Sequence, residues 1–269
     1  MTAKIVALYN HKGGIAKTTS VVNLASQLFM YQNKKVAIID GDSQNNCPSC
    51  FARVLPKQFP GLLEVVKGEA SIHDIRIRVA ENEEDDAFID IYPAGLSLED
   101  LEKVVERNPE QHHPSTLVLY KHVFRELVNK YDFILVDCKP SMSFTNRNIL
   151  TAADAVVLPM ELSNLAFQGL TQSIDFIDEV REQSNPHIQI AGVFLTKVER
   201  ATHQTVIFKT LNEYLKKKGI RLYKSMIPRS TKFENALTFD GTTAVLSKRM
   251  KKDNAVIQYG SLTQEIFNS

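Results

Sequence analysis

A segment near the start of the sequence, YNHKGGIAKTTSVVNLA (residues 9–25), combines the residue types that bind phosphate. Gly13 and Gly14 let the backbone approach an anion closely, and the N–H groups at the start of a helix point at it. Lys17 supplies positive charge to terminal phosphates, and the Thr18 hydroxyl is a suitable ligand for Mg²⁺. The segment therefore predicts a site for a nucleoside triphosphate and Mg²⁺.

This segment departs from the usual P-loop pattern, G-x-x-x-x-G-K-[ST], which would place glycine at positions 11 and 16. His11 and Ala16 stand there instead. If the backbone at Ala16 has a positive φ, the methyl group costs on the order of 1 kcal/mol, which a tightly bound ligand offsets. The alternative is an ordinary glycine-containing turn with a solvated lysine, and the strand–loop–helix context disfavours it.

Two carboxylates, Asp40 and Asp42, follow a short apolar run. Beside a phosphate-binding loop they are candidates for metal binding and for orienting water. The alternative is that they cap the next segment as ordinary strand-end carboxylates.

The elements that must position these residues are short β-branched runs alternating with helical patterns. Helical spacing places Val21, Leu24 and Leu28 on one apolar face, and similar faces recur around residues 170–177, 207–215 and 253–267. We expect a further helix from about Ser97. The predicted strands are residues 4–9, 36–40, 88–95, 133–138, 155–160, 188–196 and 222–228.

Nearly continuous apolar strands separated by helices predict an α/β fold, with a doubly wound, mostly parallel sheet covered by helices on both faces. In such a sheet ligands sit beyond the carboxyl ends of the strands, where residues 10–19 would lie. The segments 81–86 and 107–115 are predicted to be exposed loops. Because neither divides the chain, we expect one domain over residues 1–269.

The composition sets few other limits. The 269 residues are 43% hydrophobic and 23% charged with a net charge of +1, so any contact with nucleic acid must come from local patches. No apolar run approaches the roughly 20 residues that span a bilayer. The N-terminus lacks the pattern of a signal peptide, and three cysteines suit a reducing cytoplasm. We therefore expect a cytoplasmic protein.

The motifs together resemble the ParA/MinD family of ATPases. The run NHKGGIAKTTSVVNLA is similar to the family's deviant Walker A box, K-G-G-x-x-K-[ST]. Residues 36–46 resemble its D-x-D-x-Q switch segment, and residues 133–141 its Walker B strand and turn. Residues 192–200 and 226–236 resemble its later strand ends. The resemblance spans nearly the whole chain, is strongest toward ParA-type partition ATPases, and implies a P-loop NTPase of the deviant Walker A type.

This resemblance implies a role for each matching position in the loop. Lys12 would be the signature lysine that crosses a dimer interface to the partner's nucleotide. Lys17 would hold the β- and γ-phosphates, Thr18 the Mg²⁺ and Thr19 another phosphate oxygen. The nucleotide-binding positions as a whole would be Gly13, Gly14, Ile15, Ala16, Lys17, Thr18, Thr19, Pro228 and Arg229, the last two framing the adenine.

The resemblance also implies roles for the carboxylates. Asp137 would bind Mg²⁺ through water, Asp40 would support the metal shell, and Asp42 would orient the attacking water. Phosphoryl transfer depends chiefly on positioning and charge stabilisation, so lysines, a metal ion and one water-orienting carboxylate suffice. Lys12, Lys17 and Asp42 are thus the expected catalytic residues, with ATP and Mg²⁺ as cofactors.

Some positions depart from the family pattern. Lys139 stands where proline is usual, and it either reaches phosphate or is a solvated loop lysine, which we favour. Asn235 stands where the family tends to have glutamate, so any switching role there is in doubt. Cys47 and Cys50 form a CxxC that could be redox-active or half of a zinc site. Without a second cysteine or histidine pair, we expect them to be small packing residues, and Cys138 to lie in the core.

The basic residues fall into two groups. We expect Lys216–Lys218 to be a solvated face. The resemblance and the clustering of charge favour non-specific contact with DNA phosphates, which needs no base readout, for the second group. Its members are Arg200, Lys232, Lys248, Arg249, Lys251 and Lys252.

The function that the resemblance implies is that of a ParA-type ATPase. ATP would drive a homodimer that binds DNA non-specifically on the nucleoid, and a ParB-like partner would stimulate hydrolysis to segregate a plasmid or chromosome. An alternative is the positioning of a protein cargo, with a cargo-adaptor protein as the partner. A MinD-like membrane regulator is less favoured, because the last segment carries Glu265 and no lysine or arginine. A metabolic enzyme of the same superfamily is the remaining alternative.

Overall fold

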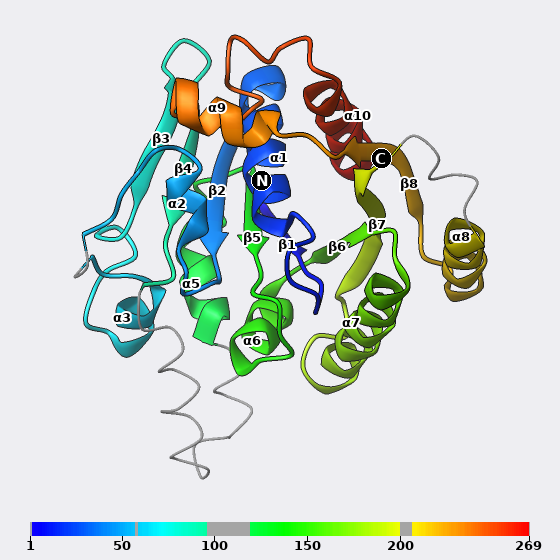
Figure 1. Ribbon diagram of the computed structural model, residues 1–269. Helices are drawn as coiled ribbons and strands as arrows, with labels where there is room; N and C mark the ends of the chain where they lie inside the picture. The colour runs from blue at the N-terminus through cyan, green and yellow to red at the C-terminus, as the bar shows by residue number, and fades with distance from the viewer. Residues whose placement is uncertain (1, 57–58, 96–118, 200–205, 269) are drawn as a thin grey trace.

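One sheet of eight strands passes through the molecule in the order β3-β4-β2-β5-β1-β6-β7-β8 (Figure 1). The computed structural model describes residues 2–56, 59–95, 119–199 and 206–268. All neighbouring strands are parallel except β3 and β4, which form an antiparallel pair at one edge. The strands are β1 (Lys4–Leu8), β2 (Lys35–Asp40), β3 (Ile77–Asn82), β4 (Ala87–Tyr92), β5 (Phe133–Asp137), β6 (Ala155–Glu161), β7 (Gln189–Val198) and β8 (Leu222–Pro228).

Helices cover both faces of this sheet, as the sequence predicted. Two buried apolar clusters lie on opposite faces. Helices α1 and α10 pack over one face through Leu24, Leu28 and Leu262, and α6 and α7 pack over the other through Ile149 and Ile174. The helices are α1 (Lys17–Gln32), α2 (Asn46–Ser49), α3 (Leu62–Lys67), α5 (Leu119–Leu127), α6 (Phe144–Ala152), α7 (Asn164–Gln183), α8 (Val206–Lys218), α9 (Lys232–Asp240) and α10 (Asn254–Phe267).

The seven strands predicted from apolar runs are confirmed, with ends shifted by a few residues. The edge strand β3 was missed. It is only half-buried, and the register shift between Arg78 and Ala80 breaks its alternation, so its pattern is not that of a core strand. The prediction of a loop over residues 81–86 is therefore wrong for Glu81 and Asn82, which end β3. The helix predicted from Ser97 and the loop 107–115 lie outside the described residues.

The C-terminal segment forms a core-packed helix, as predicted. In α10, Val256, Leu262 and Ile266 are buried, and the Tyr259 hydroxyl lies 2.9 Å from the Ser20 hydroxyl of α1. Ile257 is an exception on the outer side of the helix, with 53% of its surface exposed. No helix in the described parts of the chain is both long and apolar enough to cross a membrane.

The direction in which strands are added to the sheet reverses at β1. After β1 the chain proceeds to β2 on one side of β1, whereas β6, β7 and β8 follow on its other side. In open parallel sheets the crevice at such a switch of direction is where ligands bind. The segment of residues 9–16, between β1 and α1, lies at this position (Figure 1).

Candidate functional site

The loop between β1 and α1 has the backbone of a tight anion-binding turn. Ala16 adopts φ 64° and ψ 33°, and Gly14 has φ 72°. The positive φ considered for Ala16 from the sequence is therefore present, with a cost of about 1 kcal/mol for a residue that carries a Cβ. Ile15 is buried, and its carbonyl accepts a 3.1 Å hydrogen bond from the Thr196 hydroxyl of β7. The strained turn is thus tied to a neighbouring strand.

The ammonium of Lys17 lies within this loop. Its Nζ donates to the backbone carbonyls of Asn10 at 3.2 Å and Lys12 at 3.0 Å, and only 7% of the residue is exposed. Burial lowers the pKa of Lys17, while the negative charge of Asp137 opposes the shift. A buried ammonium surrounded by carbonyls gains from a nearby anion, so the position suits a phosphate-binding lysine.

One hydroxyl group and two carboxyl groups lie together beside Lys17. The Thr18 hydroxyl donates a 2.5 Å hydrogen bond to Oδ2 of Asp137. Asp137 and Asp40 are register partners at the ends of β5 and β2, and both are fully buried. Burial raises the pKa of each carboxyl group, and for Asp40 the charge of Asp137 raises it further.

This group of oxygens fits a magnesium ion. Carboxylate and hydroxyl oxygens are the ligands that Mg²⁺ prefers. Among the described residues, Oδ1 of Asp137 is buried and accepts no hydrogen bond, so it has a lone pair to offer. A divalent cation would also offset the repulsion between two buried carboxylates. Thr18, Asp40 and Asp137, the three predicted metal residues, are thus brought together.

Asp42 lies on the turn that follows β2. Its backbone N–H donates to Oδ1 of Asp40 at 3.1 Å, and its own Oδ1 accepts from the N–H of Gln44 at 3.1 Å. The side chain is half-buried at the border of the carboxylate group. Gly41 precedes it and donates its N–H to the Asp137 carbonyl at 2.8 Å. This close approach of two strand ends was not expected from the sequence.

Lys12 lies at the rim of the loop. Its Nζ is 3.5 Å from the Ser163 hydroxyl, which caps the N-terminus of α7, and its N–H donates to the Asn10 side chain at 3.0 Å. Nearby segments expose large apolar side chains, with Leu165 70% and Met142 45% exposed. The rim therefore combines a lysine with apolar surface.

The ends of β6, β7 and β8 carry an ionic network that sequence reasoning missed. The Lys197 ammonium donates to the Gly14 carbonyl and lies 3.7 Å from Glu161. Arg229, which follows Pro228, pairs with Glu161 at 3.5 Å and with Glu199 at 3.7 Å. The network joins Gly14, in the loop between β1 and α1, to Pro228 and Arg229, the predicted adenine-framing pair.

The predicted DNA-binding residues lie mostly on the segment between α9 and α10. Two of them already have acidic partners, Lys232 with Asp253 and Arg249 with Asp240, the latter at 3.2 Å. Lys248, Lys251 and Lys252 are exposed. Arg200 lies outside the described residues. Of the predicted DNA-binding residues, those at positions 248–252 therefore form an exposed cluster on one short segment.

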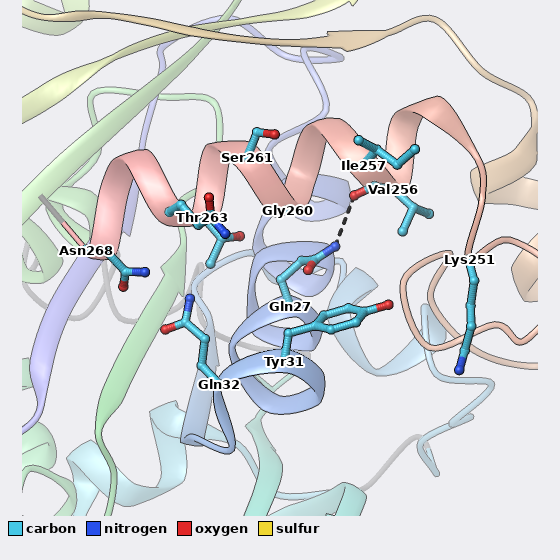
Figure 2. Close-up of a pocket in the computed structure, with 11 residues that line it drawn as sticks. Gln27, Tyr31, Gln32, Lys251, Val256, Ile257, Gly260, Ser261, Thr263 and Asn268 are labelled. Atoms are coloured by element: carbon cyan, nitrogen blue, oxygen red, sulfur yellow. Dashed lines mark hydrogen bonds between the residues drawn. The ribbon is translucent and has the colours of Figure 1, made fainter.

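A groove of about 480 Å³ lies between α1 and α10 (Figure 2). Gln27 and Tyr31 of α1 line it, with Lys251 at one end. Gln27 is ten residues beyond Lys17, about 15 Å along the helix, so this groove is separate from the loop between β1 and α1.

The three cysteines are free thiols. Cys138 is in the core, as predicted. Cys47 is also buried, but its Sγ lies 3.7 Å from Oδ2 of Asp137 and its N–H donates to Oδ2 of Asp40 at 2.9 Å. Its position beside the carboxylates depends on the pairing of β2 with β5, which sequence spacing does not reveal. Lys139 is half-buried, and its carbonyl accepts from Asn146.

Comparisons with known proteins agree with this geometry. A family model described as an AAA domain matches residues 3–190, more than half of the chain. Cyanothece McdA in complex with ATP superposes with a TM-score of 0.82 at 18% identity, covering 99% of this chain and 97% of that one. Cobyrinic acid a,c-diamide synthase from Mycobacterium smegmatis, with bound ATP analogue and magnesium, gives 0.78 at 22% identity over 97% and 93%. These two likenesses show the shared fold.

Two curated relatives are closer in sequence. The sporulation initiation inhibitor protein Soj of Bacillus subtilis is 31% identical over 235 residues, 87% of this chain and 87% of that protein. The chromosome partitioning protein ParA of Caulobacter vibrioides is 30% identical over 237 residues, 88% of this chain and 84% of that protein. The chain therefore belongs to the ParA/MinD family of deviant Walker A ATPases.

Proposed function

We propose that residues 1–269 form a single domain that binds ATP with Mg²⁺ and hydrolyses it to ADP and phosphate. The observation that carries this proposal is the arrangement around Lys17, whose buried ammonium lies in a strained loop beside Thr18, Asp40 and Asp137. The ATP analogue and magnesium bound by the synthase with the same fold support it.

Each residue of the site has a distinct task in this proposal. Lys17 and the N–H groups at the start of α1 neutralise the phosphates. Thr18, Asp40 and Asp137 would hold Mg²⁺, which supplies positive charge against the phosphate oxygens during transfer. Asp42 orients the water that attacks the terminal phosphate. Pro228 and Arg229 frame the adenine, with Arg229 held by Glu161 and Glu199.

ATP binding drives the formation of a homodimer. Lys12 lies at the rim rather than inside the loop, and its ammonium is 3.5 Å from the Ser163 hydroxyl, a weak contact that it can leave. The apolar side chains of Leu165 and Met142 on this rim would be covered by the second subunit. Lys12 then contributes charge to the partner's nucleotide, in the manner of an arginine finger.

The dimer binds DNA through phosphate contacts and travels on the nucleoid in the cytoplasm. The exposed lysines 248, 251 and 252 would be present twice in a dimer, which makes the affinity for DNA depend on ATP. A ParB-like partner protein stimulates hydrolysis and releases the dimer, so that a plasmid or chromosome is segregated. Identity of about 30% to chromosome partitioning ParA supports this choice of cargo.

The test measures dimerisation and DNA binding together. Sedimentation velocity with a slowly hydrolysed ATP analogue should give a dimer, whereas ADP should give a monomer. Gel-shift assays with two unrelated duplexes should give similar affinities that depend on the analogue. Leu165→Glu should block the dimer and DNA binding but not nucleotide binding, while Phe239→Glu, at another exposed apolar position, should block neither. A monomer with every nucleotide would overturn the proposal.

A further inference from the structure

Cys47 forms a compact group with two carboxylates. Its Sγ and one oxygen each from Asp40 and Asp137 all lie within 4.8 Å of one another, and the three residues are buried. Neither ATP hydrolysis nor the proposed dimer requires a sulfur atom at this place. Among the described residues, Oδ1 of Asp137 is buried without a hydrogen-bond partner, so the group also contains an unused acceptor.

The distance between Cys47 and Asp137 is close to that between two ligands of a zinc ion. Zinc–sulfur and zinc–oxygen bonds of about 2.3 and 2.0 Å at tetrahedral angles place sulfur and oxygen about 3.5 Å apart. The observed distance from Cys47 Sγ to Asp137 Oδ2 is 3.7 Å. Three protein ligands leave the fourth position open for water, as in catalytic zinc sites.

The surroundings hold these ligands in place. Asp40 accepts hydrogen bonds from the N–H groups of Asp42 and Cys47, and Asp137 accepts one from Thr18. Such secondary contacts orient metal ligands and increase affinity. Two carboxylates and a thiolate carry three negative charges, which a divalent cation and the neighbouring Lys17 ammonium would balance.

We propose that Asp40, Cys47 and Asp137 bind a thiophilic divalent cation such as Zn²⁺ or Cd²⁺ in the nucleotide-free protein. Coordination replaces the S–H bond of Cys47 with a sulfur–metal bond, and the thiol proton and the proton held by the carboxyl pair are both released to solvent. A thiolate ligand favours zinc or cadmium over magnesium, which prefers oxygen. Because two of the ligands are the predicted magnesium residues, a bound thiophilic ion would occupy them before ATP and Mg²⁺ arrive.

Cadmium alone is the probe for this site. The nucleotide-free, full-length protein in a phosphine reductant would be titrated with Cd²⁺ while the ultraviolet sulfur-to-cadmium charge-transfer band is recorded. The band should saturate at one ion per chain. Cys47→Ser should lose the band and bind cadmium at least about tenfold more weakly. The matched variants Cys50→Ser and Cys138→Ser should retain it.

A second variant protects the test against a folding defect in Cys47→Ser. Asp40→Asn keeps the thiol and should retain the band but weaken cadmium binding, and melting curves of both variants would report folding. The proposal is overturned if the wild type gives no band, if the band survives in Cys47→Ser, or if Asp40→Asn leaves the affinity unchanged. Loss of the band in Cys50→Ser would also overturn it, by placing the ion on the CxxC pair. None of these outcomes depends on dimerisation or DNA binding.

Discussion

Asp40 and Asp137 lie opposite each other at the ends of the paired strands β2 and β5. Two buried carboxylates that face each other across paired strands repel one another. The nucleotide-free protein therefore keeps a proton on this carboxyl pair, whereas the unfolded chain releases it. Burial raises the pKa of Asp40 from 3.8 to about 8, and the charge of Asp137 adds to the shift. The carboxyl pair therefore lowers the stability of the cation-free protein, and a bound cation would offset this loss.

This relationship predicts a pH dependence of stability. Because the folded protein keeps a proton on Asp40 that the unfolded chain loses above 3.8, stability falls as pH rises toward about 8. Asp40→Asn removes this contribution, so its melting temperature should fall less steeply with pH than that of the wild type. Thermal melts across this range, without nucleotide and with a chelator, would measure both slopes. Parallel slopes would contradict a raised pKa at Asp40.

Gly41 should tolerate no side chain. A Cβ there would lie 2.7 Å from the carbonyl oxygen of Asp137 and 2.8 Å from Cδ1 of Ile149. Gly41→Ala should therefore push the ends of β2 and β5 apart, lower the free energy of unfolding by about 1–3 kcal/mol and weaken binding of nucleotide with Mg²⁺.

Gly68→Ala is the matched control for this variant. Gly68 has φ 76°, and a Cβ added there would meet no atom of the described residues within 4 Å. The variant should therefore lose about 1 kcal/mol of stability and keep its nucleotide affinity. Denaturant titration and fluorescent-nucleotide binding would compare the two. If Gly41→Ala and Gly68→Ala bind nucleotide equally well, the spacing of the β2 and β5 ends does not affect nucleotide binding.

Asp42→Ala should stop turnover without preventing ATP binding. Its carboxylate is the proposed water-orienting group, whereas its backbone N–H, which supports Asp40, survives the substitution. The variant should remain a dimer in ATP and release no phosphate above background. A phosphate-release assay beside size-exclusion chromatography would test this, and turnover at the wild-type rate would remove Asp42 from the catalytic residues.

Charge reversal at Lys248 and Lys252 should weaken binding to every DNA sequence alike. The slope of log affinity against log salt is negative, and each lost phosphate contact reduces its magnitude by about 0.9. Lys216→Glu with Lys217→Glu, at the end of α8, is the control of equal charge and should have little effect. Binding measured over a salt series would decide, and an unchanged slope in the first variant would make residues 248–252 ordinary solvated surface.

Much of the fold was predictable because buried parallel strands have long apolar runs. The strands that end at Leu8, Asp40 and Asp137 were placed correctly. Their positions also located the edge of the sheet at which the residues that follow these strands lie together. Strand β3 was not predictable, because it has no continuous apolar run. Its Arg78 instead forms an ion pair with Asp90 on the neighbouring strand β4.

The candidate site was predictable where its residues are close in sequence or follow strand ends. The contact between the Lys197 ammonium and the Gly14 carbonyl joins residues 183 positions apart, so no local pattern could indicate it. Cys47 is similar, because only the register of β2 against β5 brings its sulfur to Asp137. Sequence reasoning therefore selected the residues that are proposed to bind phosphate, but it missed the contacts between strand ends.

In the proposed dimer, Lys12 of one subunit completes the nucleotide site of the other. Sedimentation velocity of Lys12→Ala with a slowly hydrolysed ATP analogue, with nucleotide affinity measured on the same sample, tests this role. We expect the wild type to be a dimer, and the variant to be a monomer that still binds the analogue through Lys17 and Thr18. A variant that dimerises as readily as the wild type would show that Lys12 does not join the two subunits through the nucleotide.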